Sequence, residues 1–171
     1  MWVALGLPYD SSSNYASAYS YDGINWTGVT VATSNLSRYW YIPQTSIAWN
    51  GTLWIAVNRG WNSTIAYSID GIRWVNLQTN TYNSSIFLND DGQVGGLNCG
   101  GSGVAWNGTL FVAVGTPDQI SPNAGSIGYS YNPTATNGST WFAAPNSTNI
   151  FSTKGAAVTW NGNMFIAVGV S

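Results

Sequence analysis

The chain has 171 residues, of which 6% are charged and 15% are aromatic, and it contains neither histidine nor glutamate. Its net charge is −2, and its only cations are Arg38, Arg59, Arg73 and Lys154, too few to neutralise a run of nucleic-acid phosphates. The high aromatic content excludes a disordered chain, and no apolar run approaches the ~18 residues of a membrane span. We therefore expect one folded domain that binds no nucleic acid and does not insert into a membrane.

An apolar pattern opens the chain and recurs along it. Residues 1–5 match the second half of a longer pattern at 47–57, 104–114 and 158–168, where two strand-like runs flank an Asn-Gly pair. Asn-Gly is typical of a two-residue hairpin, in which both turn residues must take a positive φ angle. We predict structural hairpin turns at Asn50-Gly51, Asn107-Gly108 and Asn161-Gly162.

A second signature follows each apolar pattern. Residues 18–26 read Ala-Tyr-Ser-Tyr-Asp-Gly-Ile-Asn-Trp, and residues 66–74 read Ala-Tyr-Ser-Ile-Asp-Gly-Ile-Arg-Trp. The third copy is looser, because seven residues separate Gly-Tyr-Ser-Tyr-Asn at 128–132 from Thr-Trp at 140–141. Asp-Gly between strand-like runs again indicates a turn, in which the carboxylate accepts backbone N–H groups. We predict structural turns at Asp22-Gly23 and Asp70-Gly71 rather than catalytic carboxylates.

The two signatures repeat together with periods of 52, 57 and 54 residues, measured between Met1, Leu53, Leu110 and Met164. Each period holds four short strands, and the second of them is apolar on both faces, as at 110–114. A strand with two apolar faces needs cover on both sides. A four-stranded unit of this length that cannot bury both faces alone is typical of a β-propeller blade, whereas a sandwich would not repeat one hairpin so closely.

The pattern Ser-x-Asp-Gly-x-x-Trp, at Ser20 to Trp26 and at Ser68 to Trp74, resembles the Asp-box of sialidase-type (BNR-like) β-propellers. In that family the box lies in the turn between the third and fourth strands of a blade. The usual box has one more residue between Asp and Gly, and the third copy has Asn132 in place of Asp. The Asn- and Trp-rich hairpins are also similar to repeats in virion proteins of large DNA viruses and in secreted microbial proteins. The resemblance implies an all-β propeller.

Counting strands predicts a single propeller segment over residues 1–171, with about three blades and an extra strand pair. The expected blade boundaries are approximately 1–46, 47–103 and 104–157, and another blade starts at 158–171. Because propellers have four to eight blades, we expect an incomplete ring or part of a larger propeller. Open ends expose strand edges and apolar faces, so the expected partners are other copies of the chain or neighbouring structural proteins.

Binding is expected on the rim whose loops vary in length, because variable loops on a rigid scaffold commonly carry binding residues. Tyrosine, tryptophan and arginine are enriched at interface hot spots. The candidate contact residues on this rim are Arg38, Tyr39, Trp40, Tyr41, Trp61 and Tyr82.

The regularly repeated tryptophans have two interpretations. They can fill the space between blades, which we favour, or stack on sugars as in propeller lectins, since an indole ring offers a flat apolar face. Carbohydrate binding is therefore the alternative to a structural or adhesive role, with glycans as partners. These residues are Trp26, Trp74 and Trp141 after the second signature, and Trp49, Trp106 and Trp160 before the Asn-Gly pairs.

Catalysis is not expected, because the only adjacent carboxylates are Asp90 and Asp91 and no histidine is present to activate Cys99. A remnant glycosidase is a third hypothesis. Asp90 and Asp91 are also a weak calcium candidate, but their surroundings lack the EF-hand spacing and we favour a polar turn. We predict no catalytic residue, no resident metal and no cofactor.

Eight Asn-x-Ser/Thr sequons occur, where nineteen asparagines and 36 serines and threonines would give about four by chance. Together with the charge-poor composition, they predict an extracellular or virion-surface glycoprotein. The biased composition is the alternative explanation, and Asn50 and Asn107 already have turns to form. The candidate glycosylation sites are Asn25, Asn35, Asn50, Asn62, Asn83, Asn107, Asn137 and Asn146.

Overall fold

A computed structural model describes residues 1–6, 15–34, 36, 46–58, 64–77, 86–87, 100–117, 124–134 and 140–171. Over these ranges the chain is all-β, as the sequence predicts, with thirteen antiparallel strands and two helices of four residues. Neither of those helices is long and apolar enough to cross a membrane.

The strands form two complete four-stranded sheets, which stand between two smaller sheets. The N-terminal sheet has the order β1 (Trp2–Leu5), β2 (Tyr15–Ser20), β3 (Thr27–Thr30), and helix α1 (Val31–Ser34) follows it. The second sheet has the order β4 (Ser46–Trp49), β5 (Trp54–Val57), β6 (Ile65–Ser68), β7 (Val75–Asn76). The third sheet has the order β8 (Gly101–Trp106), β9 (Phe111–Gly115), β10 (Ile127–Ser130), β11 (Phe142–Ala143). Helix α2 (Ser147–Ile150) then leads to the C-terminal hairpin of β12 (Lys154–Trp160) and β13 (Phe165–Val170).

Equivalent sequence positions have equivalent strand partners in these sheets. Ser20 lies opposite Trp2, Ser68 lies opposite Trp54, and Ser130 lies opposite Phe111. The three hairpins β4–β5, β8–β9 and β12–β13 also share one cross-strand pair. In each of them a tryptophan lies opposite an aromatic residue. These pairs are Trp49 with Trp54, Trp106 with Phe111, and Trp160 with Phe165.

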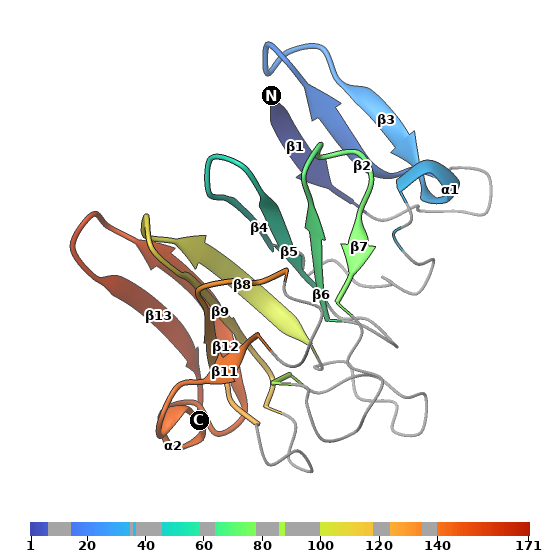
Figure 1. The fold of residues 1–171 in the computed structure, drawn as a ribbon. Helices are drawn as coiled ribbons and strands as arrows, with labels where there is room; N and C mark the ends of the chain where they lie inside the picture. The colour runs from blue at the N-terminus through green and yellow to red at the C-terminus, as the bar shows by residue number, and fades with distance from the viewer. Residues whose placement is uncertain are drawn as a thin grey trace.

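The sheets follow one another in chain order, with the N-terminal sheet and the C-terminal hairpin at opposite ends of the molecule (Figure 1). Strand β4 contacts β8, and β8 contacts β12, so the first strands of successive sheets are neighbours. Glycine permits this approach, because a Cβ atom at Gly103 would lie 3.0 Å from the Val158 backbone nitrogen and 3.1 Å from Ala157 Cα.

Among the described residues, the buried apolar side chains form two layers, each between successive sheets. Ala16 and Leu36 of the N-terminal part pack with Ala56 and Trp74 of the second sheet. On the other face of the second sheet, Ile55 packs in a cluster that includes residues of the third sheet; that cluster contains Leu53, Ile55, Val57, Val104, Phe111, Ala113 and Trp141. Strand β5 therefore buries both faces, as its sequence predicts, and Ile55 and Ala56 are each 0% exposed.

The Asn-Gly turns differ from the predicted two-residue type. The β4–β5 ladder ends at Trp49 opposite Trp54, which leaves residues 50–53 as the loop. Gly51 has φ +102°, but Asn50 is not among the described residues with a positive φ. Instead, Asn50 Oδ1 accepts hydrogen bonds from the backbone N–H of Thr52 at 2.9 Å and of Leu53 at 2.7 Å. The asparagine side chain thus serves as the acceptor that closes the turn.

The same hydrogen bonds occur in the other two hairpins. Asn107 Oδ1 accepts from the backbone of Thr109 and Leu110, at 2.8 and 2.9 Å. Asn161 Oδ1 accepts from the backbone of Asn163 and Met164, at 2.9 and 2.8 Å. Gly108 and Gly162 have φ angles of +98° and +97°, so glycine supplies the left-handed backbone and asparagine supplies the acceptor.

Candidate functional site

The variable-rim contact residues predicted from the sequence lie outside the described residues, so their positions stay predictions. The same holds for the calcium candidate and for half of the sequons. The residues concerned are Arg38, Tyr39, Trp40, Tyr41, Trp61, Tyr82, Asp90, Asp91, Asn35, Asn62, Asn83 and Asn137.

The four described sequon asparagines differ in accessibility. Asn25 and Asn146 are exposed, whereas Asn50 and Asn107 are half-buried at their hairpin turns. Asn25 Nδ2, the atom that would carry a glycan, donates a 2.7 Å hydrogen bond to Asp22 Oδ2. Glycan attachment at Asn25 would compete with this bond. Asn146 is the other exposed site, and its side chain makes no capping hydrogen bond to helix α2.

Asp22 accepts four hydrogen bonds within its own turn. Its Oδ1 receives the backbone N–H groups of Ile24 and Asn25, each at 2.8 Å, and the Ser20 hydroxyl at 2.9 Å. The side-chain bond from Asn25, followed by these backbone bonds, holds the pKa of the Asp22 carboxyl well below its usual range. The Ser20 hydroxyl in turn accepts the Gly23 N–H at 2.8 Å, and Gly23 has φ +79°.

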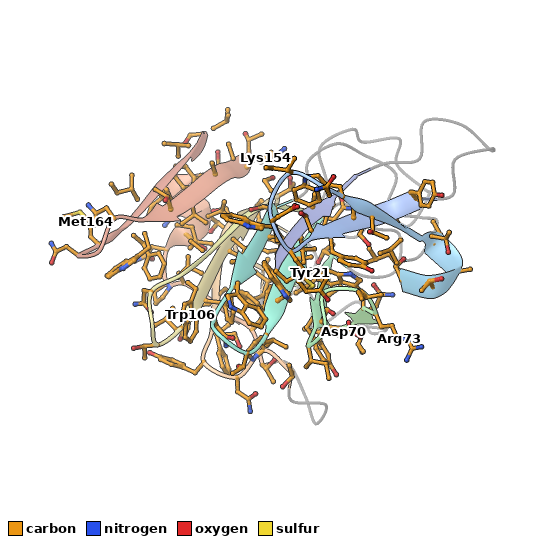
Figure 2. The ribbon with its side chains drawn as sticks, turned by 90° about the horizontal axis from the view of Figure 1, so that it is seen from above. Tyr21, Asp70, Arg73, Trp106, Lys154 and Met164 are labelled. Atoms are coloured by element: carbon orange, nitrogen blue, oxygen red, sulfur yellow. The ribbon has the colours of Figure 1, made fainter. Side chains whose placement is uncertain are left out.

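Asp70 repeats this arrangement in the second sheet. Its Oδ1 accepts the backbone N–H groups of Ile72 at 2.8 Å and Arg73 at 2.7 Å, and the Ser68 hydroxyl at 3.0 Å. Burial opposes ionisation of Asp70, but these hydrogen bonds and the Arg73 charge together lower its pKa. Figure 2 shows Asp70 and Arg73 together at the edge of the molecule. Both carboxylates are therefore engaged within their own turns.

The third copy of the turn lacks these hydrogen bonds for a reason visible in its sequence. Pro133 stands where Gly23 and Gly71 stand, and proline has no N–H to donate to the serine. The Ser130 hydroxyl is buried and makes no hydrogen bond with any of the described residues. Asn132 Oδ1 instead accepts the Thr134 hydroxyl at 3.3 Å.

The repeated tryptophans lie mainly in packed positions. Trp74 and Trp141 are buried between sheets, at 1% and 5% exposure, in the layers on either side of the second sheet. In the hairpins, Trp49 and Trp54 have ring centroids 4.7 Å apart, Trp106 and Phe111 4.5 Å, and Trp160 and Phe165 4.9 Å. Aromatic pairs at such distances stabilise the ladder that they span.

The two ends of the sheet stack present apolar surfaces that sequence reasoning did not assign to individual residues. At the N-terminal end, Trp26 is 46% exposed, although its equivalents Trp74 and Trp141 are buried. At the C-terminal end, Val168 is 56% exposed, although its equivalents Val57 and Val114 are 0% exposed. Figure 2 shows Met164 at the outer end of the C-terminal hairpin. We define the hairpin face as Met164, Ile166 and Val168, and the tryptophan face as Trp2, Ala4 and Trp26.

Strand alternation could have located both faces. In the second sheet, residues 53, 55 and 57 point toward the third sheet, and residues 54 and 56 point toward the N-terminal sheet. Carrying this alternation to β1 and β13 assigns the tryptophan face and the hairpin face, respectively, to opposite ends of the stack.

Comparison of the chain with protein-family models, with curated proteins and with solved structures found no match.

Proposed function

We propose that this protein is a β-propeller of four-stranded blades and serves as a non-enzymatic structural or adhesive interaction module, outside the cell or on a virion. The propeller is supported by the stacking of successive sheets, each covering an apolar face of its neighbour. It is also supported by the hydrogen bonds of the Asp22 and Asp70 turns, which lie between the third and fourth strands as in the Asp-box family.

The observation that carries the interaction role is the exposure of the hairpin face and the tryptophan face. Both faces consist of exposed apolar side chains, and most of their equivalents in the inner sheets are buried. Each lies beside a strand, β13 or β1, that has one strand partner among the described residues instead of two. Apolar faces beside open strand edges bind other protein surfaces.

Sedimentation velocity of the purified chain over a range of concentrations tests this role. We expect the sedimentation coefficient to rise with concentration, because association removes the two apolar faces from water. A parallel screen of glycoside substrates is expected to show no turnover. A chain that stays monomeric at every concentration, or that hydrolyses a glycoside, would contradict the proposal.

Exposed indole rings favour one alternative function, which is sugar binding. Trp2, Trp26 and Trp49 are 62%, 46% and 40% exposed, and an indole face stacks well on a sugar ring. A glycan array separates the two functions. Binding that is lost with Trp26→Ala or Trp49→Ala, and kept with the buried control Trp74→Phe, would favour the lectin.

A further inference from the structure

The two end sheets are incomplete in complementary ways within the described residues. The inner sheets have four strands, in the orders β4-β5-β6-β7 and β8-β9-β10-β11. The N-terminal sheet β1-β2-β3 has the last three of these positions, and the hairpin β12-β13 has the first two. Strands β1 and β13 therefore occupy the same position, that of β5 and β9.

The open edge of β13 presents the backbone groups with which β1 holds β2. The Gly6 N–H donates to the Ala16 carbonyl at 3.1 Å, so alternate residues Trp2, Ala4 and Gly6 direct their backbone groups toward β2. In the hairpin, Asn161 N–H donates to the Met164 carbonyl, so 164, 166 and 168 face β12. The intervening residues 165, 167 and 169 face the open edge, and they are the equivalents of Trp2, Ala4 and Gly6.

We propose that two copies of this chain associate by exchanging strands. Strand β13 of one copy takes the place of β1 beside β2 of the other, which creates a four-stranded sheet of order β12-β13-β2-β3. This inference rests on the proposed interaction role and specifies its partner, which is a second copy.

The exchange also covers both exposed apolar faces. Ile166 and Val168 would take the positions of Val3 and Leu5, which already pack against the buried cluster that contains Ala56, Ala66 and Trp74 of the second sheet. Trp26 would lie against the third sheet of the other copy, as Trp141 lies in the layer between the second and third sheets. The exchange releases β1 and replaces it with β13 of the other copy. Strand β12 remains paired with β13 and becomes the first strand of the new sheet.

The number of sheets that a closed ring can hold predicts an assembly of two copies. Counting only the sheets of the described residues, each copy of residues 1–171 supplies two four-stranded sheets, and a reciprocal exchange adds two more, which gives six. Propellers have four to eight such sheets. By the same count, one copy of residues 1–171 closing on itself would give three sheets and a ring of three copies would give nine, so we expect residues 1–171 to form an assembly with twice their mass of 18.3 kDa.

Proline substitution at equivalent positions of the full chain tests the exchange. Ala167→Pro places proline where the N–H faces an open edge, so the single copy keeps its hydrogen bonds but β13 cannot pair with β2. Ala4→Pro instead removes an N–H that faces β2, which weakens the strand that β13 must displace. By sedimentation velocity we expect a dimer for the native chain, a monomer for Ala167→Pro, and a dimer of at least native affinity for Ala4→Pro.

A cysteine pair gives a readout that does not depend on the proline variants. Val3 lies opposite Tyr19, so the exchange brings Ile166 opposite Tyr19 of the other copy. In a Cys99→Ser background, a Tyr19→Cys chain mixed with an Ile166→Cys chain is expected to form a disulfide-linked heterodimer on oxidation. A Tyr67→Cys chain is the matched control, because Ile55 already lies opposite Tyr67, and it should not cross-link to the Ile166→Cys chain.

The outcomes separate the two proposals. If the native chain associates and the Ala167→Pro variant has the same assembly mass, the exchange is overturned but the interaction role stands. A dimer lost in Ala4→Pro also overturns the exchange, because it would place β1 within the interface. Equal cross-linking of the Tyr19→Cys and Tyr67→Cys chains has the same consequence. A native chain that is monomeric throughout overturns both proposals.

Discussion

Three serine residues at equivalent positions differ in the hydrogen bonds that their hydroxyls make. The Ser20 and Ser68 hydroxyls each accept a glycine N–H and donate to an aspartate. Ser130 is equally buried but lies before Asn132-Pro133, and its hydroxyl has no hydrogen-bond partner within the part of the chain that the structure describes. The third copy of the turn therefore has the serine but not the hydrogen bonds that Ser20 and Ser68 make in the other two copies.

We predict that Ser68→Ala lowers the free energy of unfolding by about 1–3 kcal/mol, because it leaves the Gly71 N–H without its acceptor. Ser130→Ala should change the free energy by less than about 0.5 kcal/mol, since no hydrogen bond is lost. Urea unfolding followed by tryptophan fluorescence measures both. Equal losses for the two variants would mean that the Ser68 hydroxyl does not hold the turn.

The lowered pKa values of the turn aspartates lead us to expect a loss of stability in acid. The pKa of Asp70 is lower in the folded protein than the unfolded value of about 3.9. Its carboxylate therefore contributes stability above about pH 4, and this contribution disappears as the pH falls from there through the lowered pKa. Urea unfolding midpoints between pH 7 and pH 2 should fall for the native chain and fall less for Asp70→Asn. Further flattening in the Asp22→Asn, Asp70→Asn double variant would assign that additional part of the pH dependence to Asp22.

At the scale of elements, the strands and their pairing could be predicted from the sequence, but the turn type could not. The apolar residues on both faces of 110–114 predict a strand buried on both faces, and Val112, Ala113 and Val114 confirm it. An Asn-Gly pair, however, suits both a turn in which asparagine needs a positive φ and one in which its side chain is the acceptor. Loop length decides between them, and it depends on where the ladder ends, which the local sequence does not encode.

The observed turn predicts which substitutions the hairpins tolerate. If asparagine served for its φ angle, glycine would replace it well; since it serves as an acceptor, aspartate should replace it better. We expect Asn107→Asp to stay within about 0.5 kcal/mol of the native free energy of unfolding. Asn107→Gly should cost about 1 kcal/mol, because the N–H groups of Thr109 and Leu110 lose their acceptor. Chemical denaturation at neutral pH compares the two, and greater stability for the glycine variant would contradict this account.

At the scale of the whole molecule, position in the sheet stack gives identical sequence elements different environments. Trp26 and Trp74 end the same signature, yet one is 46% exposed and the other 1%. The local sequence cannot encode this difference, since it depends on whether a sheet lies on the outer side. The predicted contacts at 38–41, 61 and 82 stay untested because they lie outside the described residues. The described part of the chain instead directs attention to the two ends of the stack.

A lysine placed at equivalent positions measures the difference between an end face and an inner face. Val57 is 0% exposed and Val168 is 56% exposed, and both occupy the same position in their strands. In an Ala167→Pro background, where exchange is blocked, Val168→Lys should change the free energy of unfolding by less than about 0.5 kcal/mol. Val57→Lys should cost more than about 3 kcal/mol, because it buries an unpaired charge.

The same Val168→Lys substitution in the native background should weaken dimerisation strongly, because exchange would bury that position as Val57 is buried. Sedimentation velocity measures this effect, and raising the salt concentration should not restore the dimer, since the cost is the desolvation of a charge rather than long-range repulsion. If Val168→Lys leaves dimerisation unchanged, the hairpin face lies outside the interface. A single side chain that is neutral for folding and decisive for association would therefore identify this end of the stack as a binding surface.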